Sequence, residues 1–312
     1  MSAQAALQLA CRALATLARR LPRPVALRGA DGVAAWAWCL FRLTPWRGHL
    51  HRVLRGAWGV EETAAEVGRV ARSHVRELAR NIVELLRLPL FPVERGAVVA
   101  GATGWEHVEE ARAAGRGVIV ATAHYGNWEV LGAELAARGL VLHVLVQPPS
   151  QAAFAHLFVE LRDAVGVRTW SNGGRVALRP VLRALRAGEA LGLLADQHGE
   201  AQEAIVRLFG RPVSAPTGVF SLARRTGAVV LPMRVVRGPD GRHWLHVEPP
   251  LAPSGDDEAD MQRLYACYER WIREHPDHWL WVHDRWAREP ELRRPPVGPL
   301  RAPGGVPAGG AA

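Results

Sequence analysis

Lysine is absent from this 312-residue sequence, so all 39 of its basic residues are arginine. A Walker-type phosphate loop needs a lysine after its second glycine, and Schiff-base catalysis needs a lysine amine, so both chemistries are excluded. With 30 acidic residues the formal net charge is +9. Part of the arginine bias reflects codon composition, because Ala, Gly and Pro are abundant as well. A guanidinium still suits phosphate and carboxylate oxygens, which favours acidic partners such as anionic lipid, a phosphopantetheine carrier or nucleic acid.

Cysteine is scarce, with only Cys11, Cys39 and Cys267, and none of them forms a CxxC pair. An odd, scattered set supports neither a disulfide framework nor a thiolate metal site, and it fits a reducing, cytosolic-side location. The chain is otherwise ordinary, at 49% hydrophobic and 22% charged residues. Such a composition predicts a folded protein that can bury a sizeable core as one large or two small domains.

A long uninterrupted hydrophobic run is also missing near the N-terminus. The longest charge-free candidate runs from Gly32 to Phe41, between Asp31 and Arg42. A bilayer-spanning helix needs roughly 20 apolar residues, so we expect neither a transmembrane helix nor a cleavable signal peptide here.

Residues 3–21 instead have the pattern of a basic amphipathic helix that ends at Pro22. Such a helix can lie among the headgroups of an acidic leaflet, or it can pack its leucines on the protein's own core. An aromatic and arginine-rich segment follows, which is also what a membrane interface needs. The leucine repeat comprises Leu7, Ala10, Leu14, Leu17 and Leu21, with Arg12, Arg19, Arg20 and Arg23 elsewhere on the helix; the second segment holds Trp36, Trp38, Phe41, Trp46 and Trp58 among Arg42, Arg47, Arg52 and Arg55.

The hydrophobic period changes near residue 90. Residues 1–90 read as helical, and the long repeat from Glu61 to Leu88 stops at Pro89. Short β-rich runs then alternate with helical stretches, which indicates an α/β fold with helices on both faces of a sheet. The strands are expected at 117–122, 141–146, 190–195 and 229–235, with a hairpin partner at 244–248 that makes the sheet mixed, and the helices near 127–138, 151–164, 175–187, 216–226 and 256–274.

These patterns divide the chain into three parts. Residues 1–90 form a helical element that is suited to membrane association, and residues 91–290 form one α/β catalytic domain. Residues 291–312 are rich in Pro, Gly and Ala, and are expected to be a disordered tail.

The most informative block runs from Gly117 to Glu129, a buried-strand pattern that ends in His124 and turns into a helix. Gly126 permits unusual backbone angles, Asn127 is a good N-cap, and Glu129 falls in the first helical turn. Residues five apart lie about 140° around a helix, so His124 and Glu129 can meet only if His124 lies on the loop before it.

A carboxylate on one imidazole nitrogen raises the basicity of the other, which can then take a proton from a hydroxyl. The alternative is a purely structural role, in which a histidine at the end of the strand only forms a hydrogen bond with the helix cap. No GxSxG elbow is present, the nearest approach being Thr169–Gly173, and no cysteine lies close by. Direct attack of a bound hydroxyl on an activated acyl group is therefore favoured over a covalent acyl-enzyme.

The block His124-Tyr-Gly-Asn-Trp-Glu129 resembles the HX4(D/E) motif of the lysophospholipid acyltransferase superfamily, and specifically that of the bacterial lipid A biosynthesis late acyltransferases. Later blocks resemble the family in order and spacing over roughly residues 70 to 287. They are Glu160-Leu-Arg162 with Gly166; Leu185-Arg-Ala-Gly188 with Asp196-Gln197; Leu208-Phe-Gly210 with Pro212, Ala215, Thr217 and Gly218; and Ile272-Arg273 with Pro276 and Trp279-Leu-Trp281-Val-His283-Asp-Arg285-Trp286.

The resemblance implies a glycerol-3-phosphate acyltransferase-like α/β fold and a set of roles. His124 would be the general base on the acceptor hydroxyl, with Glu129 as its orienting partner. Arg162 would bind a phosphate of the lipid or carrier, and Asp196, followed by Gln197, would organise the site. From position alone, Asn127 and Gly126 could offer N–H donors to the thioester oxygen. Arg175, opening a helix after two glycines, could meet an anionic head group or belong to a plain capped loop.

The same resemblance implies an enzyme that moves a fatty acyl group from acyl carrier protein or coenzyme A to a hydroxyl of a lipid A precursor. No metal or prosthetic cofactor is required, because the thioester supplies the activation. The expected location is the cytoplasmic face of the inner membrane, peripheral or weakly anchored on its anionic surface, because the family's hydrophobic N-terminal anchor is weak here.

Two departures from the family pattern bear on which acceptor substrate the protein uses. His198 follows Asp196-Gln197 where the family has Asp, and Pro276-Asp-His-Trp279 replaces Pro-Glu-Gln-Tyr. The rival acceptors are lysophospholipid, phosphatidylinositol mannoside and other glycolipids. Rivals of another class are a catalytically silent anionic-lipid-binding protein and a hydrolase. Nucleic acid is not an expected partner, since the tryptophans do not interleave with a basic stripe and no recognised binding motif is present.

Overall fold

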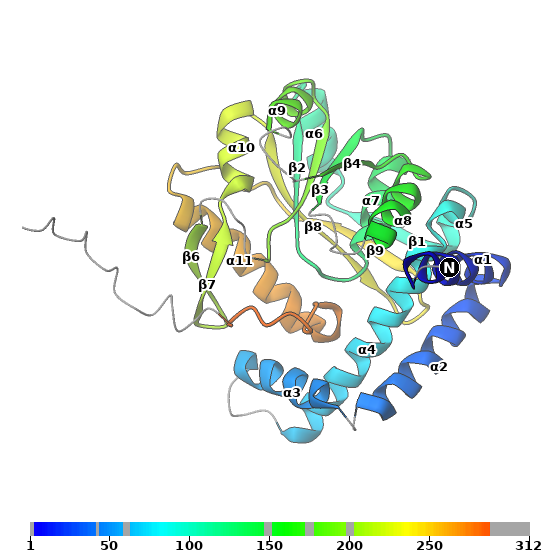
Figure 1. Cartoon of the computed structure of the whole chain (residues 1–312). Coiled ribbons are helices and arrows are strands. Elements are labelled where there is room, and N and C mark those ends of the chain that lie inside the picture. Colours follow the sequence, from blue (N-terminus) through cyan, green and yellow to red (C-terminus); the bar gives the residue numbers. More distant parts are fainter. Residues whose placement is uncertain are drawn as a thin grey trace, which may run out of the picture.

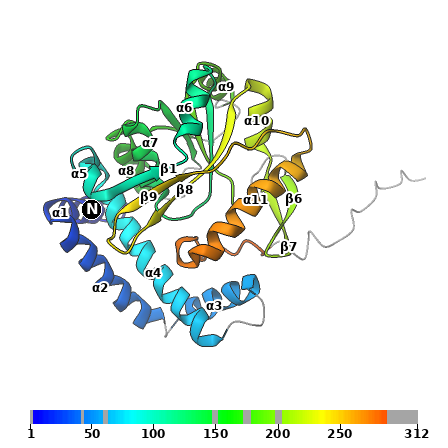
Figure 2. The same cartoon turned by 180° about the vertical axis from the view of Figure 1, so that it is seen from behind.

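The computed structural model describes residues 3–41, 44–58, 63–146, 152–171, 178–197 and 203–287. The described residues up to 90 are mostly helical, as expected; α5 continues the helical part to residue 98, and together these helices extend along one side of the molecule (Figures 1 and 2). Thr63 and Glu66 form a reciprocal capping box at the start of the long fourth helix. The elements are α1 (Ala3–Arg20), α2 (Arg23–Phe41), α3 (Pro45–Trp58), α4 (Ala64–Leu86), η1 (Leu88–Leu90) and α5 (Phe91–Val98).

None of the helices in the described ranges is both long and apolar enough to cross a bilayer. The first helix does not pack its leucines inward. Ala15 and Ala18 are buried, whereas Leu14 and Leu17 are more than half exposed. The interpretation in which α1 packs its leucines on the core is therefore wrong, because the helix face that carries Ala15 and Ala18 makes the contact instead.

The central sheet has seven strands in the order β1-β9-β8-β2-β5-β3-β4. The strands from β8 to β4 run parallel, while β8 and β9 pair antiparallel as the expected hairpin, so the sheet is mixed. The predicted α/β class is thus confirmed. The strands are β1 (Val99–Thr103), β2 (Val118–Thr122), β3 (Leu142–Val146), β4 (Arg168–Ser171), β5 (Ala190–Leu194), β8 (Val229–Arg237) and β9 (His243–Val247).

Helices cover both faces of this sheet (Figure 1), which explains why β2 is buried at every position. Ile119 and Ala121 belong to one core cluster, whereas Val118 and Val120 belong to the cluster on the other face. The remaining elements are α6 (Glu106–Ala113), α7 (Trp128–Ala137), α8 (Ala152–Asp163), α9 (Leu178–Arg186), α10 (Gly218–Thr226), α11 (Asp257–Glu274) and η2 (Pro276–His278), with a separate antiparallel ribbon of β6 (Glu203–Leu208) and β7 (Arg211–Pro216).

Several of these elements have weak sequence signals. Strands β1, β4, β6 and β7 were not expected, because each contains polar or small residues among its apolar ones. The segment from Trp279 to Trp286 begins with an isolated bridge between Trp279 and Tyr125 and continues in turns. The aromatic rings of Trp279, Trp281 and Trp286 are buried. The expected tail at 291–312 lies outside the described residues.

Candidate active site

The site begins where two neighbouring parallel strands end. Strands β2 and β5 pair in register, with Thr122 opposite Leu194, so residues two positions further along each strand also lie side by side. These residues are His124 and Asp196. His124 Nδ1 lies 2.8 Å from Asp196 Oδ1. Asp196 is buried, and the His124 side chain is 18% exposed, so the histidine is the member of the pair that a substrate can reach.

Asp196 is held as an anion at this position. Burial by itself raises its pKa, but the charge of His124, its hydrogen bond to Asp196, and the charge of Arg285 outweigh burial and lower the pKa to about 2. Trp279 Nε1 donates to the second carboxylate oxygen at 3.0 Å. An ionised Asp196 can only accept, so His124 Nδ1 carries the proton and Nε2 presents its lone pair. Within the described residues, Nε2 has no hydrogen-bond partner.

Glu129, the expected partner of His124, is engaged elsewhere. It lies in the first turn of α7 and forms a two-pronged ion pair with Arg162 in the last turn of α8, with N–O distances of 2.9 and 2.6 Å. Both side chains are mostly buried, at 11% and 13% exposure. The carboxylate in contact with His124 is thus Asp196, and Glu129 instead fixes a guanidinium close to the same helix end.

The loop between His124 and α7 has a backbone that requires glycine at one position. Gly126 has φ +59°, and a Cβ there would lie 2.0 Å from the Val235 carbonyl oxygen. Its N–H donates to the His278 carbonyl at 2.9 Å, so this group is not available to a thioester oxygen. Its own carbonyl accepts from Asn81 Nδ2 at 2.7 Å. The loop is therefore fixed from both α4 and η2.

Asn127 acts as the N-cap of α7, as expected from the sequence. Its side-chain oxygen accepts the N–H of Val130 at 3.2 Å, and its amide nitrogen donates to Glu84 Oε2 at 2.8 Å. Within the described residues its main-chain N–H has no hydrogen-bond partner. At the start of a helix this N–H points where negative charge is favoured.

Glu84 on α4 is the centre of a buried polar network that supports this loop. It pairs with Arg237 at 2.8 Å, His243 at 2.9 Å and Arg23 at 2.6 Å. Attraction to His243 and Arg237 outweighs the effect of burial and holds the pKa of Glu84 well below its usual range. The network joins α2, α4, the β8–β9 hairpin and the cap of α7. It therefore connects the N-terminal helices directly to the loop after His124.

A narrow apolar cavity lies beside the loop, between α7 and the sheet. Trp128 and the Glu129–Arg162 pair line its polar end, and Trp128 also packs edge-on against His124 with ring centroids 5.0 Å apart. The lining residues deeper in come from β2, β3, β5 and α7: Val120, Leu131, Leu135, Leu142, Val144 and Leu193. Through Trp128, the histidine thus lies next to a mostly hydrophobic cavity.

Two further residues, Gln197 and Arg175, were expected at the site, and the structure describes only the first. Gln197 follows Asp196 and is half-buried, whereas Arg175 lies outside the described residues. In the described part of the chain, no group of three His, Cys, Asp or Glu side chains is placed to hold a metal ion.

Sequence reasoning missed the direct pairing of His124 with Asp196, and it also missed Trp279 and Glu84. A signal for the first did exist: the predicted strands 117–122 and 190–195 are each followed closely by a titratable side chain, and the ends of parallel neighbours meet at one edge. Trp279 contacts Asp196, 83 residues away in the sequence, and Glu84 contacts Asn127, 43 residues away. The local sequence pattern does not predict either contact.

Comparison with known proteins shows the family to which the chain belongs. A family model described as bacterial lipid A biosynthesis acyltransferase matches residues 3–288. A phosphatidylinositol mannoside acyltransferase of Mycobacterium tuberculosis (strain ATCC 25618 / H37Rv) is 30% identical over 190 residues, which cover 60% of each chain. The lipid A biosynthesis lauroyltransferase of Escherichia coli K12 is 28% identical over 213 residues, which cover 64% of this chain and 66% of that one.

The palmitoleoyltransferase of lipid A biosynthesis in the same organism is 25% identical over 240 residues, covering 74% of this chain and 75% of the other. The chain therefore spans about 60% of the length of the mycobacterial relative and about three quarters of this one. The match of the family model over nearly the whole chain decides the classification. This chain belongs to the bacterial lipid A biosynthesis acyltransferase family.

Proposed function

We propose that this protein transfers a fatty acyl group from a thioester, carried by acyl carrier protein or coenzyme A, to a hydroxyl of a lipid A precursor. The observation that carries the proposal is the His124–Asp196 pair, together with Trp128, which packs against His124 and lines an apolar cavity. A general base next to a hydrophobic pocket is what an enzyme needs to deprotonate an alcohol beside a bound acyl chain.

The reaction needs no covalent intermediate on the protein. His124 Nε2 accepts the proton of the acceptor hydroxyl while the hydroxyl oxygen attacks the thioester carbonyl carbon. The C–S bond then breaks, and the proton on His124 passes to the leaving thiolate. Asp196 holds the ring through Nδ1 and stabilises the imidazolium that forms in between. The negative charge on the carbonyl oxygen faces the start of α7, where the Asn127 main-chain N–H serves as a donor.

Glu129 and Arg162 are assigned a binding role. Their ion pair lies at the polar end of the cavity, and Arg162 has further donors that can bind a phosphate of the carrier or the lipid. Glu129 fixes the guanidinium in place. This replaces the sequence-based role of Glu129 as the direct partner of His124.

The N-terminal helices support a peripheral place on the anionic cytoplasmic face of the inner membrane. The outer side of α1 and α2 carries large apolar side chains in solvent, among them Leu9, Leu14, Leu17, Val33 and Trp36, each more than half exposed. Arginines at 12, 19, 20 and 28 lie on the same two helices. Apolar side chains beside guanidiniums match a headgroup layer with anionic lipids.

A transfer assay tests the proposal. Radiolabelled acyl-carrier-protein and coenzyme A thioesters are offered to wild type and to His124→Ala with a tetraacylated lipid A precursor. Phosphatidylinositol mannoside is supplied in parallel, because the mycobacterial relative is named for that acceptor. Label in the lipid A precursor that requires His124 is the expected result. Label only in the mannoside would keep the mechanism and replace the acceptor, and no transfer to any lipid would overturn the proposal.

A further inference from the structure

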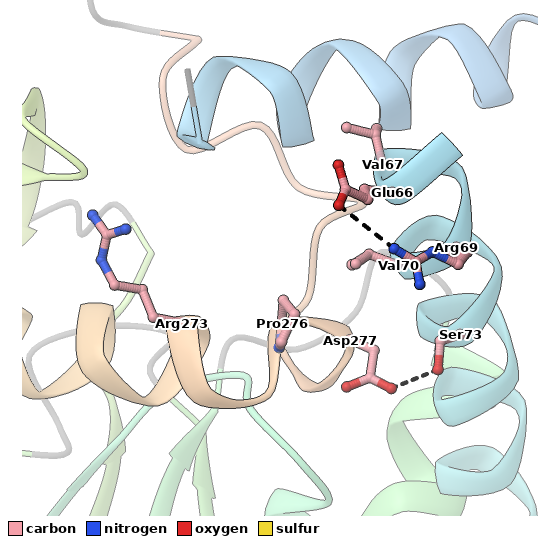
Figure 3. A pocket seen from close by; sticks show the side chains of 8 residues that line it. All are labelled: Glu66, Val67, Arg69, Val70, Ser73, Arg273, Pro276 and Asp277. Carbon is pink, nitrogen blue, oxygen red and sulfur yellow. Dashed lines mark hydrogen bonds and ion pairs between the residues drawn. The ribbon is translucent and has the colours of Figure 1, made fainter. Parts of the chain in front are cut away.

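A second, larger hollow lies between α4 and the corner where α11 passes into η2 (Figure 3). Its volume is about 460 Å³, within the usual range for small-molecule sites. Arg69 lies on α4 on one side and Arg273 on α11 on the other, as Figure 3 shows. Glu66, Ser73 and Asp277 complete its polar lining. We call this hollow the α4–α11 groove.

The chemistry of the groove is mixed rather than apolar. Both guanidiniums are largely in solvent, with side-chain exposures of 77% for Arg69 and 55% for Arg273. Arg273 also pairs with Glu269 at 2.7 Å along its own helix, which leaves its other donors for a ligand. Arg69 reaches Glu66 only at 3.7 Å, and Ser73 donates to Asp277 at 2.5 Å. Guanidinium forks suit phosphate, while carboxylates and a hydroxyl suit sugar hydroxyls. This combination fits a polyhydroxylated ligand that carries a phosphate.

The groove shares a lining residue with a small hollow close to the reaction centre. Asp277 lines the groove and also a small hollow that Trp128 closes, and Trp128 lines the apolar cavity. Three residues after Asp277, the Leu280 N–H donates to the His124 carbonyl at 3.0 Å. Trp128, which packs against His124, therefore lines both the small hollow next to the polar groove and the apolar cavity. The two substrates of a transfer reaction need two such environments.

We propose that the α4–α11 groove binds the phosphorylated sugar head group of the acceptor lipid, an assignment that rests on the proposed acyl transfer. Arg69 and Arg273 bind the phosphate from opposite walls, and the carboxylates bind hydroxyls of the sugar. The acceptor thus approaches His124 from the groove while the acyl chain of the donor occupies the cavity under α7.

The first experiment separates the two substrates kinetically. Arg273→Ala and Arg69→Ala are compared with Arg270→Ala, a control on α11 with similar exposure (50%) whose partner is Glu248, outside the groove. Loss of one charge-assisted hydrogen bond is expected to raise the acceptor KM about tenfold, and to leave the donor KM and kcat unchanged. Arg273→Lys should restore part of the affinity, and thermal melts check that each variant is folded. Equal acceptor KM values for Arg273→Ala and Arg270→Ala would overturn the proposal.

The second experiment is independent of turnover. Saturation-transfer NMR measures binding of a lipid-free glucosamine disaccharide bisphosphate, and of a mannosylated inositol phosphate, to the donor-free protein. Wild type should bind one of the two, and the Arg69→Ala/Arg273→Ala double variant should lose most of that binding. Absence of binding, or equal binding by both proteins, would reject the groove. A wild type that binds the head group but transfers no label would instead retain the groove and reject the acyl transfer.

Discussion

Asp196 is the carboxylate that contacts His124 Nδ1 at 2.8 Å, and in the proposed mechanism it stabilises the imidazolium. Asp196→Asn removes the negative charge next to Nδ1 and offers that nitrogen an amide in place of a carboxylate. We expect a loss of kcat of about 10²-fold or more, because the imidazolium is no longer stabilised. The measurement is single-turnover acyl transfer at saturating thioester. Trp279→Phe, which deletes only the second hydrogen bond on Asp196, is the control, and an equal loss in both variants would argue against this role.

Glu129 and Arg162 are expected to act as one unit. If Glu129 only fixes Arg162, then Glu129→Gln and Arg162→Gln each lower activity, and the double variant is no worse than the poorer single one. The same cycle in the free energy of unfolding should give a coupling of about 1–3 kcal/mol. If Glu129 served His124 directly, the effects on kcat would be additive instead. Urea unfolding and steady-state kinetics on the four proteins distinguish the two cases.

At the scale of the elements, the turn between β2 and α7 depends on one glycine. Gly126→Ala places a methyl group against the Val235 carbonyl at a positive φ, so the free energy of unfolding should fall by about 2 kcal/mol or more and activity should be lost. Gly139, just after α7, has φ +87° with open space around it. Gly139→Ala should therefore cost only about 1 kcal/mol. Thermal melts of the two variants test the difference, and similar values would show that the contact with Val235 relaxes easily.

The elements themselves were predicted unevenly. Helices α1, α4 and α7 to α11 and the buried strands β2, β3, β5 and β8 carry a strong hydrophobic period, and each was placed within a few residues. Helix α6 was not predicted, and α2 and α3 were predicted only as part of a helical region. Strand β4 and the β6–β7 ribbon were not predicted, because edge and ribbon strands need not be apolar on both faces. The segment after Pro276 has alternating aromatics that imitate a strand, but its turns place them in the core.

At the scale of the whole molecule, buried histidines should make the fold sensitive to acid. Burial lowers the pKa of His74 from 6.5 to about 4. An unfolded chain binds this proton below pH 6.5 while the folded protein resists it, so stability falls as the pH drops from 6.5 towards 4. Between pH 7 and pH 5 the loss from this residue is about 2 kcal/mol.

Denaturant unfolding at the two pH values checks this expectation. His74→Asn keeps a donor near the Asp277 carbonyl, which His74 Nδ1 contacts at 3.2 Å, but cannot titrate. Its pH dependence should be shallower than that of wild type. A wild type and a variant that lose the same stability between pH 7 and pH 5 would contradict the assignment.

Membrane contact is the other property of the whole molecule. Vesicles that contain anionic lipid should bind the protein more tightly than neutral vesicles, and the binding should weaken with salt. Leu14→Ser/Leu17→Ser should reduce binding several-fold, since both side chains are exposed on α1. Leu178→Ser on α9, exposed at 44% and distant from α1 in both views, is the control. Sedimentation with vesicles gives the measurement, and equal loss in both proteins would reject this surface.

The sequence by itself determined the α/β class, the family resemblance, and the loop that presents His124, Gly126, Asn127 and Glu129. These features are local, because hydrophobic period, caps and motif spacing are written in consecutive residues. Only the tertiary structure decided that Asp196 contacts His124, that Glu129 pairs with Arg162, and that α1 exposes its leucines. Each of these outcomes depends on which distant segments are brought side by side, and local periodicity carries no information on the choice between two nearby carboxylates.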